Sequence, residues 1–209
     1  QSCCGQVAYN NGLPDQTRKL ALSVVDAFQY VDYVVVPSGS CASMLRNHYP
    51  ELFDRTNPKV NQFAAKVYEL TCFLVDVLNI QVTTDGKQSV PRTIAYHDSC
   101  AGLRELGIRT QPRALISQAS DDTVVPIEDE ETCCGFGGTF CVKFADISNK
   151  MVANKAENIG ALTPDLLLGG DLTCLLNLAG KLQRQGKEQI EVRHIAEYLA
   201  QHLTGYTTD

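Results

Sequence analysis

Two stretches of the same form decide the fold: Asp32-Tyr-Val-Val-Val-Pro-Ser-Gly-Ser-Cys41 and Asp165-Leu-Leu-Leu-Gly-Gly-Asp-Leu-Thr-Cys174. Each reads as a short apolar strand, a turn and a cysteine, and the two align without a gap. A Cys-Cys-Gly doublet lies upstream of each, at Cys3-Cys4-Gly5 and at Cys133-Cys134-Gly135. The doublet and the later cysteine are separated by 36 residues in the first copy and by 39 in the second. The chain is therefore predicted to contain an internal repeat with a period of about 130 residues.

Helices and strands alternate between these motifs. Amphipathic spacing predicts helices at Asp15–Tyr30, Cys41–Arg46, Asn61–Leu78, Pro112–Gln118, Ser148–Ile159, Leu172–Gln183 and Val192–Leu203. Short apolar runs predict buried parallel strands at Tyr33–Val36, Arg92–Tyr96, Thr123–Ile127 and Leu166–Leu168. Thr83–Gln88 is read as a polar loop. The predicted fold class is α/β, with two pseudo-repeated half-domains of short parallel strands flanked by helices, divided into residues 1–90 and 91–209.

Composition excludes several classes of protein. The net charge is −6, and the chain has no run of lysine or arginine. A nucleic-acid-binding surface is therefore not predicted. No apolar stretch approaches the roughly 20 residues of a membrane span. With 44% hydrophobic residues the chain can bury a core without disulfides, and its nine cysteines are an odd number. Metal binding or redox chemistry in the cytoplasm is therefore the favoured interpretation.

The repeat also predicts an upstream segment. In the second copy a strand ends in Tyr96-His-Asp-Ser-Cys100, with 32 residues between Cys100 and Cys133. The first copy should have an equivalent strand and cysteine before Gln1. We therefore expect roughly 30 to 40 further residues in the natural protein, and a first repeat that lacks its N-terminal strand and first cysteine here.

The second copy gathers four cysteines, here called the cysteine quartet: Cys100, Cys133, Cys134 and Cys174. Two of them, Cys100 and Cys174, follow a predicted strand at its carboxyl end, where ligands collect in open α/β sheets. Soft thiolates are typical ligands of zinc and of iron–sulfur clusters. Helices that begin at these two cysteines would favour the thiolate form. The glycine-rich run Gly135-Phe-Gly-Gly138 offers backbone N–H groups to sulfur. The first copy contributes only Cys3, Cys4 and Cys41, an incomplete second site.

Other readings stay open beside this one. Cys72 and Cys141 are read as structural cysteines. His97 either orients a ligand or shuttles a proton, but a histidine with satisfied hydrogen bonds is the more frequent case. Arg104 and Arg109 are minor candidates for holding a carboxylate. Dithiol–disulfide chemistry at the doublets, without any metal, is a further alternative.

The motifs resemble a known family. The order Cys, 32 residues, Cys-Cys-Gly, 39 residues, Cys is similar to the cysteine-rich CCG domain of the heterodisulfide reductases and of the iron–sulfur subunits of glycolate oxidase and anaerobic glycerol-3-phosphate dehydrogenase. The motifs themselves more narrowly resemble the lactate utilisation protein A family: Cys3-Cys-Gly-Gln-Val-Ala-Tyr-Asn10, Pro37-Ser-Gly-Ser-Cys41, Tyr96-His-Asp-Ser-Cys100 and Glu131-Thr-Cys-Cys-Gly-Phe-Gly-Gly138. This resemblance implies an iron–sulfur subunit that oxidises L-lactate to pyruvate with lactate utilisation proteins B and C. Alternatives are glycolate or another 2-hydroxy acid as substrate, or a zinc-stabilised scaffold for partner redox proteins.

One departure from the family pattern bears on the cofactor. That pattern closes with Cys-x-x-Cys, but the first position of the closing pair is Ser38 in one copy and Asp171 in the other. Four thiolates suffice for an ordinary 4Fe-4S cluster or for zinc, whereas the non-cubane cluster of the heterodisulfide reductases uses five. Asp171 is a candidate oxygen ligand for the missing position. Gly135-Phe-Gly-Gly138 is not a dinucleotide-binding glycine motif, so no nicotinamide or flavin site is predicted.

Overall fold

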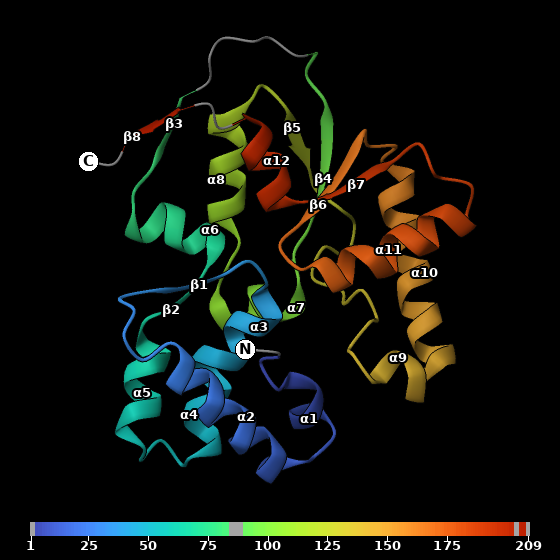
Figure 1. Cartoon of the computed structure of the whole chain (residues 1–209). Coiled ribbons are helices and arrows are strands. Elements are labelled where there is room, and N and C mark those ends of the chain that lie inside the picture. Colours follow the sequence, from blue (N-terminus) through green and yellow to red (C-terminus); the bar gives the residue numbers. More distant parts are fainter. Residues whose placement is uncertain (1–2, 84–89, 203–204, 208–209) are drawn as a thin grey trace.

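Short parallel strands organise both halves of the molecule (Figure 1). The computed structural model describes residues 3–83, 90–202 and 205–207. The strands are β1 Val34–Val36, β2 Val67–Glu69, β3 Gln81–Thr83, β4 Thr93–His97, β5 Thr123–Val125, β6 Leu166–Gly169, β7 Glu191–His194 and β8 Gly205–Thr207. They form a parallel pair β1-β2, an antiparallel pair β3-β8 and a four-stranded parallel sheet in the order β5-β4-β6-β7. In the described ranges, no helix has both the length and the apolar character to cross a bilayer.

The four-stranded sheet is the middle layer of the second half-domain, with helices on both faces (Figure 1). Its helices are α7 Cys100–Leu106, α8 Thr110–Ala119, α9 Phe140–Lys143, α10 Ala145–Ala161, α11 Leu172–Arg184 and α12 Ile195–His202. Alternate residues of β4 enter different cores, because successive side chains of a strand point to opposite faces. Ile94 and Tyr96 pack with α8 and α12, whereas Ala95 packs with α10 and α11. The α/β class predicted from the sequence is confirmed.

The first half-domain packs short helices around the β1-β2 pair. Its helices are α1 Gln6–Asn10, α2 Pro14–Ala27, α3 Gly39–Ser43, α4 Tyr49–Leu52, α5 Pro58–Ala65 and α6 Leu70–Cys72, with π-helical turns at Met44–His48 and Phe73–Val77. Tyr49 and Phe63 are almost fully buried in its core, and Cys4 is part of the same core.

The internal repeat is visible in the backbone of both halves. Strands β1 and β6 each pair in parallel with the next strand of their own half, β2 or β7. Each doublet ends in a left-handed glycine, with φ of 84° at Gly5 and 82° at Gly135. Ser38 and Asp171 occupy the same position before α3 and before α11. The two half-domains are therefore built on one local plan, while the boundary between residues 90 and 91 stays a prediction.

The sequence prediction was wrong about two segments. Asn61–Leu78 is not one helix, because β2 interrupts it: Val67 pairs with Val34 of β1, and Glu69 then caps α6 by accepting from the backbone N–H of Thr71. Val192 likewise belongs to β7, and α12 starts only at Ile195. In both segments pairing with a neighbouring strand overrides a helical hydrophobic pattern. Apart from Thr83, the loop predicted at Thr83–Gln88 lies outside the described residues, as does Leu203.

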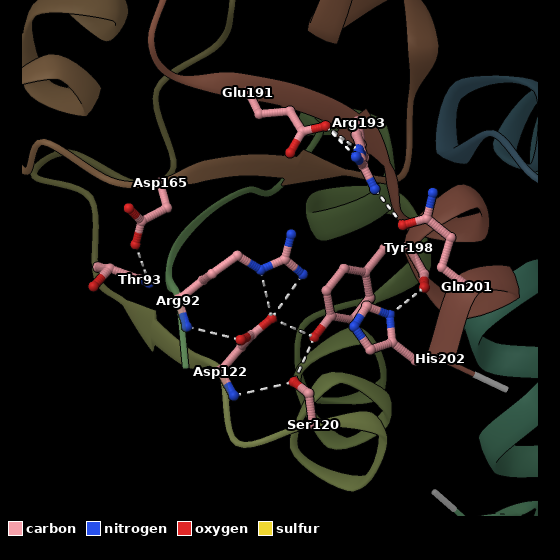
Figure 2. A network of polar contacts seen from close by, with 10 residues as sticks. All are labelled: Arg92, Thr93, Ser120, Asp122, Asp165, Glu191, Arg193, Tyr198, Gln201 and His202. Carbon is pink, nitrogen blue, oxygen red and sulfur yellow. Dashed lines mark hydrogen bonds and ion pairs between the residues drawn. The ribbon is translucent and has the colours of Figure 1, made fainter. Parts of the chain in front are cut away.

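A buried polar network ties together the amino ends of the sheet strands, opposite the cysteines. Figure 2 shows the Asp122 carboxylate accepting from the backbone N–H of Arg92 at 2.8 Å, from its guanidinium at 3.0 Å, and from the Tyr198 hydroxyl at 2.9 Å. The Asp122 side chain has no exposed surface. Burial raises the pKa of Asp122, but these hydrogen bonds outweigh it and hold the pKa below its usual value. The network fixes α12 against the strand that leads to the cysteines.

Replacing Asp122 by asparagine is expected to lower the free energy of unfolding by about 2 kcal/mol at pH 7. The amide NH₂ group of asparagine would face the N–H and O–H groups that donate to Asp122, so some of these hydrogen bonds would be lost. A group with a lowered folded pKa stabilises the fold above its unfolded pKa, near 3.9, and loses that contribution as the pH falls through the folded value. The difference between Asp122→Asn and the original protein should therefore shrink from pH 7 to pH 3 in urea denaturation. Asp121→Asn, at the exposed neighbouring position, is the control and should be neutral.

Candidate metal centre

The carboxyl end of the four-stranded sheet brings the cysteine quartet together. Strands β4 and β6 are neighbours, with His97 opposite Gly169, so the cysteines that follow them lie side by side. Cys100 is the first residue of α7, and Cys174 lies in the first turn of α11. The doublet Cys133-Cys134 reaches the same place from the loop that follows β5. Cys134 is 2% exposed and Cys174 8%, while the other two are half-buried.

The four sulfur atoms form a continuous series of interacting thiols. Hydrogen bonds with Cys100 and Cys134 hold the pKa of Cys133 far below that of an ordinary thiol. The corresponding bonds with Cys133 raise the pKa of Cys100 and of Cys134. At the end of the series, Cys134 and the neighbouring His97 imidazole lower the pKa of Cys174 to about 7 against the opposing effect of burial. The quartet thus places four thiols close enough to shift one another's pKa, an arrangement that favours a bound cation.

The doublet has a geometry of its own that the repeat preserves. The backbone N–H of Gly135 donates to Cys133 Sγ at 3.3 Å, and that of Gly5 donates to Cys3 Sγ at 3.4 Å. Both glycines adopt the left-handed conformation that L residues rarely occupy. At Gly135 a Cβ atom would also lie 2.7 Å from the carbonyl oxygen of Ser148, whereas at Gly5 the nearest atom is 3.5 Å away. Glycine is therefore required more strictly in the second doublet than in the first.

Gly135→Ala is accordingly expected to be more damaging than Gly5→Ala. The left-handed conformation alone costs a non-glycine residue about 1–3 kcal/mol, and Gly135→Ala adds a backbone clash at the helix that carries Ser148. Thermal unfolding and metal analysis of both variants test this. We expect the larger drop in melting temperature, and loss of metal, only for Gly135→Ala; equal effects would contradict the argument.

His97 lies at the same edge of the sheet, and within the described part of the chain its ring does not form the hydrogen bonds that the sequence predicts. It is 1% exposed, and neither ring nitrogen has a hydrogen-bond partner at bonding geometry among the described residues. The expectation of a satisfied histidine was therefore wrong. One ring nitrogen of His97 and the sulfurs of Cys134 and Cys174 all lie within 4.8 Å of one another. Sequence spacing alone does not predict that His97 lies beside Cys134 and Cys174; it shows only that His97 comes three residues before Cys100.

Asp171 is engaged across the boundary between the two half-domains. Its Oδ2 atom accepts from the Ser38 hydroxyl at 3.2 Å and from the backbone N–H of Ser40 at 3.1 Å, while Oδ1 accepts from the Thr173 hydroxyl at 2.7 Å. Burial raises the pKa of Asp171, but these bonds outweigh it and keep the pKa below its usual value. The two residues that replace cysteine in the closing pairs thus bind each other. The Asp171 carboxylate therefore joins the two half-domains, and its role as an oxygen ligand stays a prediction.

In the first copy a hydrogen bond between sulfur atoms joins two of the three cysteines, Cys4 and Cys41. Cys4 Sγ donates to Cys41 Sγ at 3.4 Å, and the bond raises the pKa of Cys4 and lowers that of Cys41 to about 6. Cys3 is exposed. The structure therefore brings together Cys4 and Cys41, with Cys3 beside them at the surface.

The remaining candidates lie apart from the quartet. Cys72 is half-buried at the end of α6, and burial raises its pKa to about 12. The Cys141 thiol donates to the carbonyl oxygen of Gly138 at 3.1 Å. Arg104 donates to the carbonyl oxygen of Glu131, and Arg109 forms ion pairs with Glu130 and Glu131. Both arginines therefore bind the acidic loop.

The donors of the quartet fit a thiophilic metal. They offer four sulfurs, the Gly135 N–H group that donates to Cys133 Sγ, and a buried imidazole without a partner in the described chain. Thiolates and imidazoles are the ligands that zinc and iron–sulfur clusters use, and backbone N–H groups stabilise such thiolates. A buried group of thiols beside an unpaired imidazole has no comparable use in packing alone. The site is therefore a candidate metal or iron–sulfur centre.

Comparisons with known proteins agree with this site. The profile of the cysteine-rich domain family, CCG, matches residues 1–46 and 94–179, which contain both doublets and their later cysteines. Lactate utilization protein A of Exiguobacterium sp. strain AT1b is 43% identical over 204 residues, covering 95% of this chain and 81% of the relative. Lactate utilization protein A 2 of Bacillus cereus strain AH820 is 41% identical, covering 97% of this chain and 84% of the relative. The chain therefore belongs to the lactate utilization protein A family of cysteine-rich CCG-domain proteins.

Proposed function

We propose that this protein is the iron–sulfur electron-transfer subunit of a cytoplasmic system that oxidises L-lactate to pyruvate. The observation that carries the proposal is the cysteine quartet, gathered from three separate loops at the carboxyl end of a parallel sheet. Such a site binds a redox-active cluster through sulfur and keeps it in a largely buried setting. Lactate is proposed as the substrate because the relatives are named lactate utilization proteins, and glycolate or another 2-hydroxy acid is the alternative.

The chain's own residues supply ligands, shape and electrostatics. Cys100, Cys133, Cys134 and Cys174 would hold a 4Fe-4S cluster, which would supply one-electron transfer when bound. The Gly135 N–H group stabilises negative charge on Cys133, and the first turns of α7 and α11 face the same centre. Cys3, Cys4 and Cys41 would provide ligands for a second centre in the first half-domain.

Partner proteins are part of the proposal, since oxidation of lactate needs an acceptor for two electrons. We infer that lactate utilization proteins B and C are these partners. Large apolar side chains are exposed on α9, at the start of α10, on the residue between them and on α11, and α10 contacts both α9 and α11: Val142, Phe144, Ile147, Leu172 and Leu176. Exposed apolar surface of this kind is typical of protein interaction sites.

Mixing the anaerobically purified protein with proteins B and C and L-lactate tests the proposed function. We expect the visible absorption of the cluster to bleach as pyruvate forms, and expect neither change with Cys134→Ser. D-lactate and glycolate, in parallel, separate the substrate alternatives. If pyruvate forms while the centre stays oxidised, or forms equally well when the site holds only zinc, a zinc-stabilised scaffold is the better description, because zinc does not change oxidation state.

A further inference from the structure

His97 is a buried polar side chain that the packing of the protein does not explain. It ends β4, it is 1% exposed, and both ring nitrogens lack a hydrogen-bond partner among the described residues. Burying an imidazole in this state is unfavourable, because its nitrogens lose their hydrogen bonds to water and gain none in return. Nearly all buried polar groups in folded proteins are paired, so an unpaired one calls for a partner of another kind.

The position of His97 is held firmly on both sides. Next to it, the Asp98 carboxylate binds the Arg113 guanidinium through two hydrogen bonds of 3.0 and 2.7 Å. Across the sheet, His97 pairs with Gly169, where an added Cβ atom would lie 3.1 Å from the His97 carbonyl oxygen. The backbone at His97 is therefore fixed, and one ring nitrogen lies with the sulfurs of Cys134 and Cys174, all within 4.8 Å of one another.

A ligand beyond the four thiolates would have to come from a histidine or a carboxylate close to the quartet. The residue at the position of the absent fifth cysteine, Asp171, uses its carboxylate to bind Ser38, Ser40 and Thr173. No other histidine or carboxylate in the described ranges groups with the quartet sulfurs at ligand distance. Among the described residues, His97 combines burial, ring nitrogens without a hydrogen-bond partner and a place within 4.8 Å of two quartet sulfurs.

We propose that His97 is a direct nitrogen ligand of the metal centre, which it completes as a set of four thiolates and one imidazole. The inference rests on the proposed iron–sulfur function. A neutral imidazole adds a donor without adding negative charge, so it raises the reduction potential relative to a fifth thiolate. His97, at the end of β4, thereby supplies a fifth ligand in place of the cysteine that is absent at the position of Asp171.

Pulsed EPR of the reduced, iron-loaded protein labelled with ¹⁵N-histidine tests this directly. We expect a hyperfine coupling of the size of a coordinated nitrogen, and expect it to disappear in His97→Gln. His194→Gln is the matched control, because His194 also ends a strand, is 8% exposed and has an unpaired Nε2, yet lies outside the ligand group. The His194→Gln variant should keep the nitrogen coupling. His97→Cys should retain iron and shift the midpoint potential downward.

The labelled protein without substitutions already decides the question, so a variant that fails to fold does not obscure it. Iron and an EPR signal without a coordinated-nitrogen coupling would overturn the ligand assignment while leaving the proposed function intact. A coupling that persists in His97→Gln would overturn it as well. Absence of iron altogether would contradict the proposed function, and the ligand with it.

Discussion

Replacing Cys134 by serine is expected to abolish metal binding at the quartet. Cys134 is the most buried of the four cysteines and interacts with the sulfurs of both Cys133 and Cys174. A serine hydroxyl is a hard donor that stays protonated at neutral pH, so it does not replace a thiolate. Loss of an outer-shell partner costs about 10- to 100-fold in metal affinity, and loss of a ligand should exceed that. Iron and sulfide analysis of the purified variant measures the effect.

Two cysteines of the same chain serve as matched controls. Cys72→Ser and Cys141→Ser remove thiols that are half-buried but lie outside the quartet. Both variants should keep the iron content of the original protein. Equal iron in Cys134→Ser and the controls would mean that the quartet does not hold the metal, whereas loss in Cys141→Ser alone would place the site at α9.

The second large effect is expected for Asp98→Ala. The Asp98 side chain is 2% exposed and forms a two-pronged ion pair with Arg113, itself stacked over the Tyr96 ring. Asp98→Ala removes both of these charge-assisted hydrogen bonds and leaves Arg113, whose side chain is 28% exposed, with the Glu130 carboxylate at 3.9 Å, so we expect a cost of about 2–3 kcal/mol. The variant should also hold metal less tightly, since Asp98 lies between His97 and the turn that leads to Cys100. Urea denaturation and iron analysis measure the two effects.

An exposed ion pair provides the control for Asp98. Asp15 pairs with Arg18 at 3.1 Å, but their side chains are 89% and 42% exposed. Asp15→Ala should therefore change the free energy of unfolding by less than about 1 kcal/mol and leave the metal in place. A change in Asp98→Ala as small as that of Asp15→Ala would contradict the structural role given to the Asp98–Arg113 pair.

The sequence predicts the repeat and the grouping of the quartet because both depend on local patterns. A short apolar strand followed by a turn and Cys41 or Cys174 is a local signal, and parallel strands bring their carboxyl ends together without further information. Strands β2 and β7 are different. Val67-Tyr-Glu69 and the segment at Val192 carry a helical hydrophobic pattern, and only pairing with β1 and β6 makes them strands.

Two features of the centre depend on contacts between distant residues and have no local signal. Ser38 and Asp171 lie 133 positions apart, and their hydrogen bond exists only because the half-domains pack against each other. The sequence therefore suggests Asp171 as a metal ligand and gives no sign of its hydrogen bonds to Ser38 and Ser40. The unpaired state of His97 likewise depends on the strands and helices around it, whereas its sequence neighbourhood indicates an ordinary satisfied histidine.

Everything proposed for this protein depends on an iron–sulfur centre held by the quartet Cys100, Cys133, Cys134 and Cys174. Element analysis, with sulfide assay and EPR, of the protein purified anaerobically from its native source tests for that centre. We expect iron and inorganic sulfide in equal amounts and an EPR signal on reduction, all lost in Cys134→Ser. Stoichiometric zinc with no iron in that same anaerobic preparation would contradict the assignment.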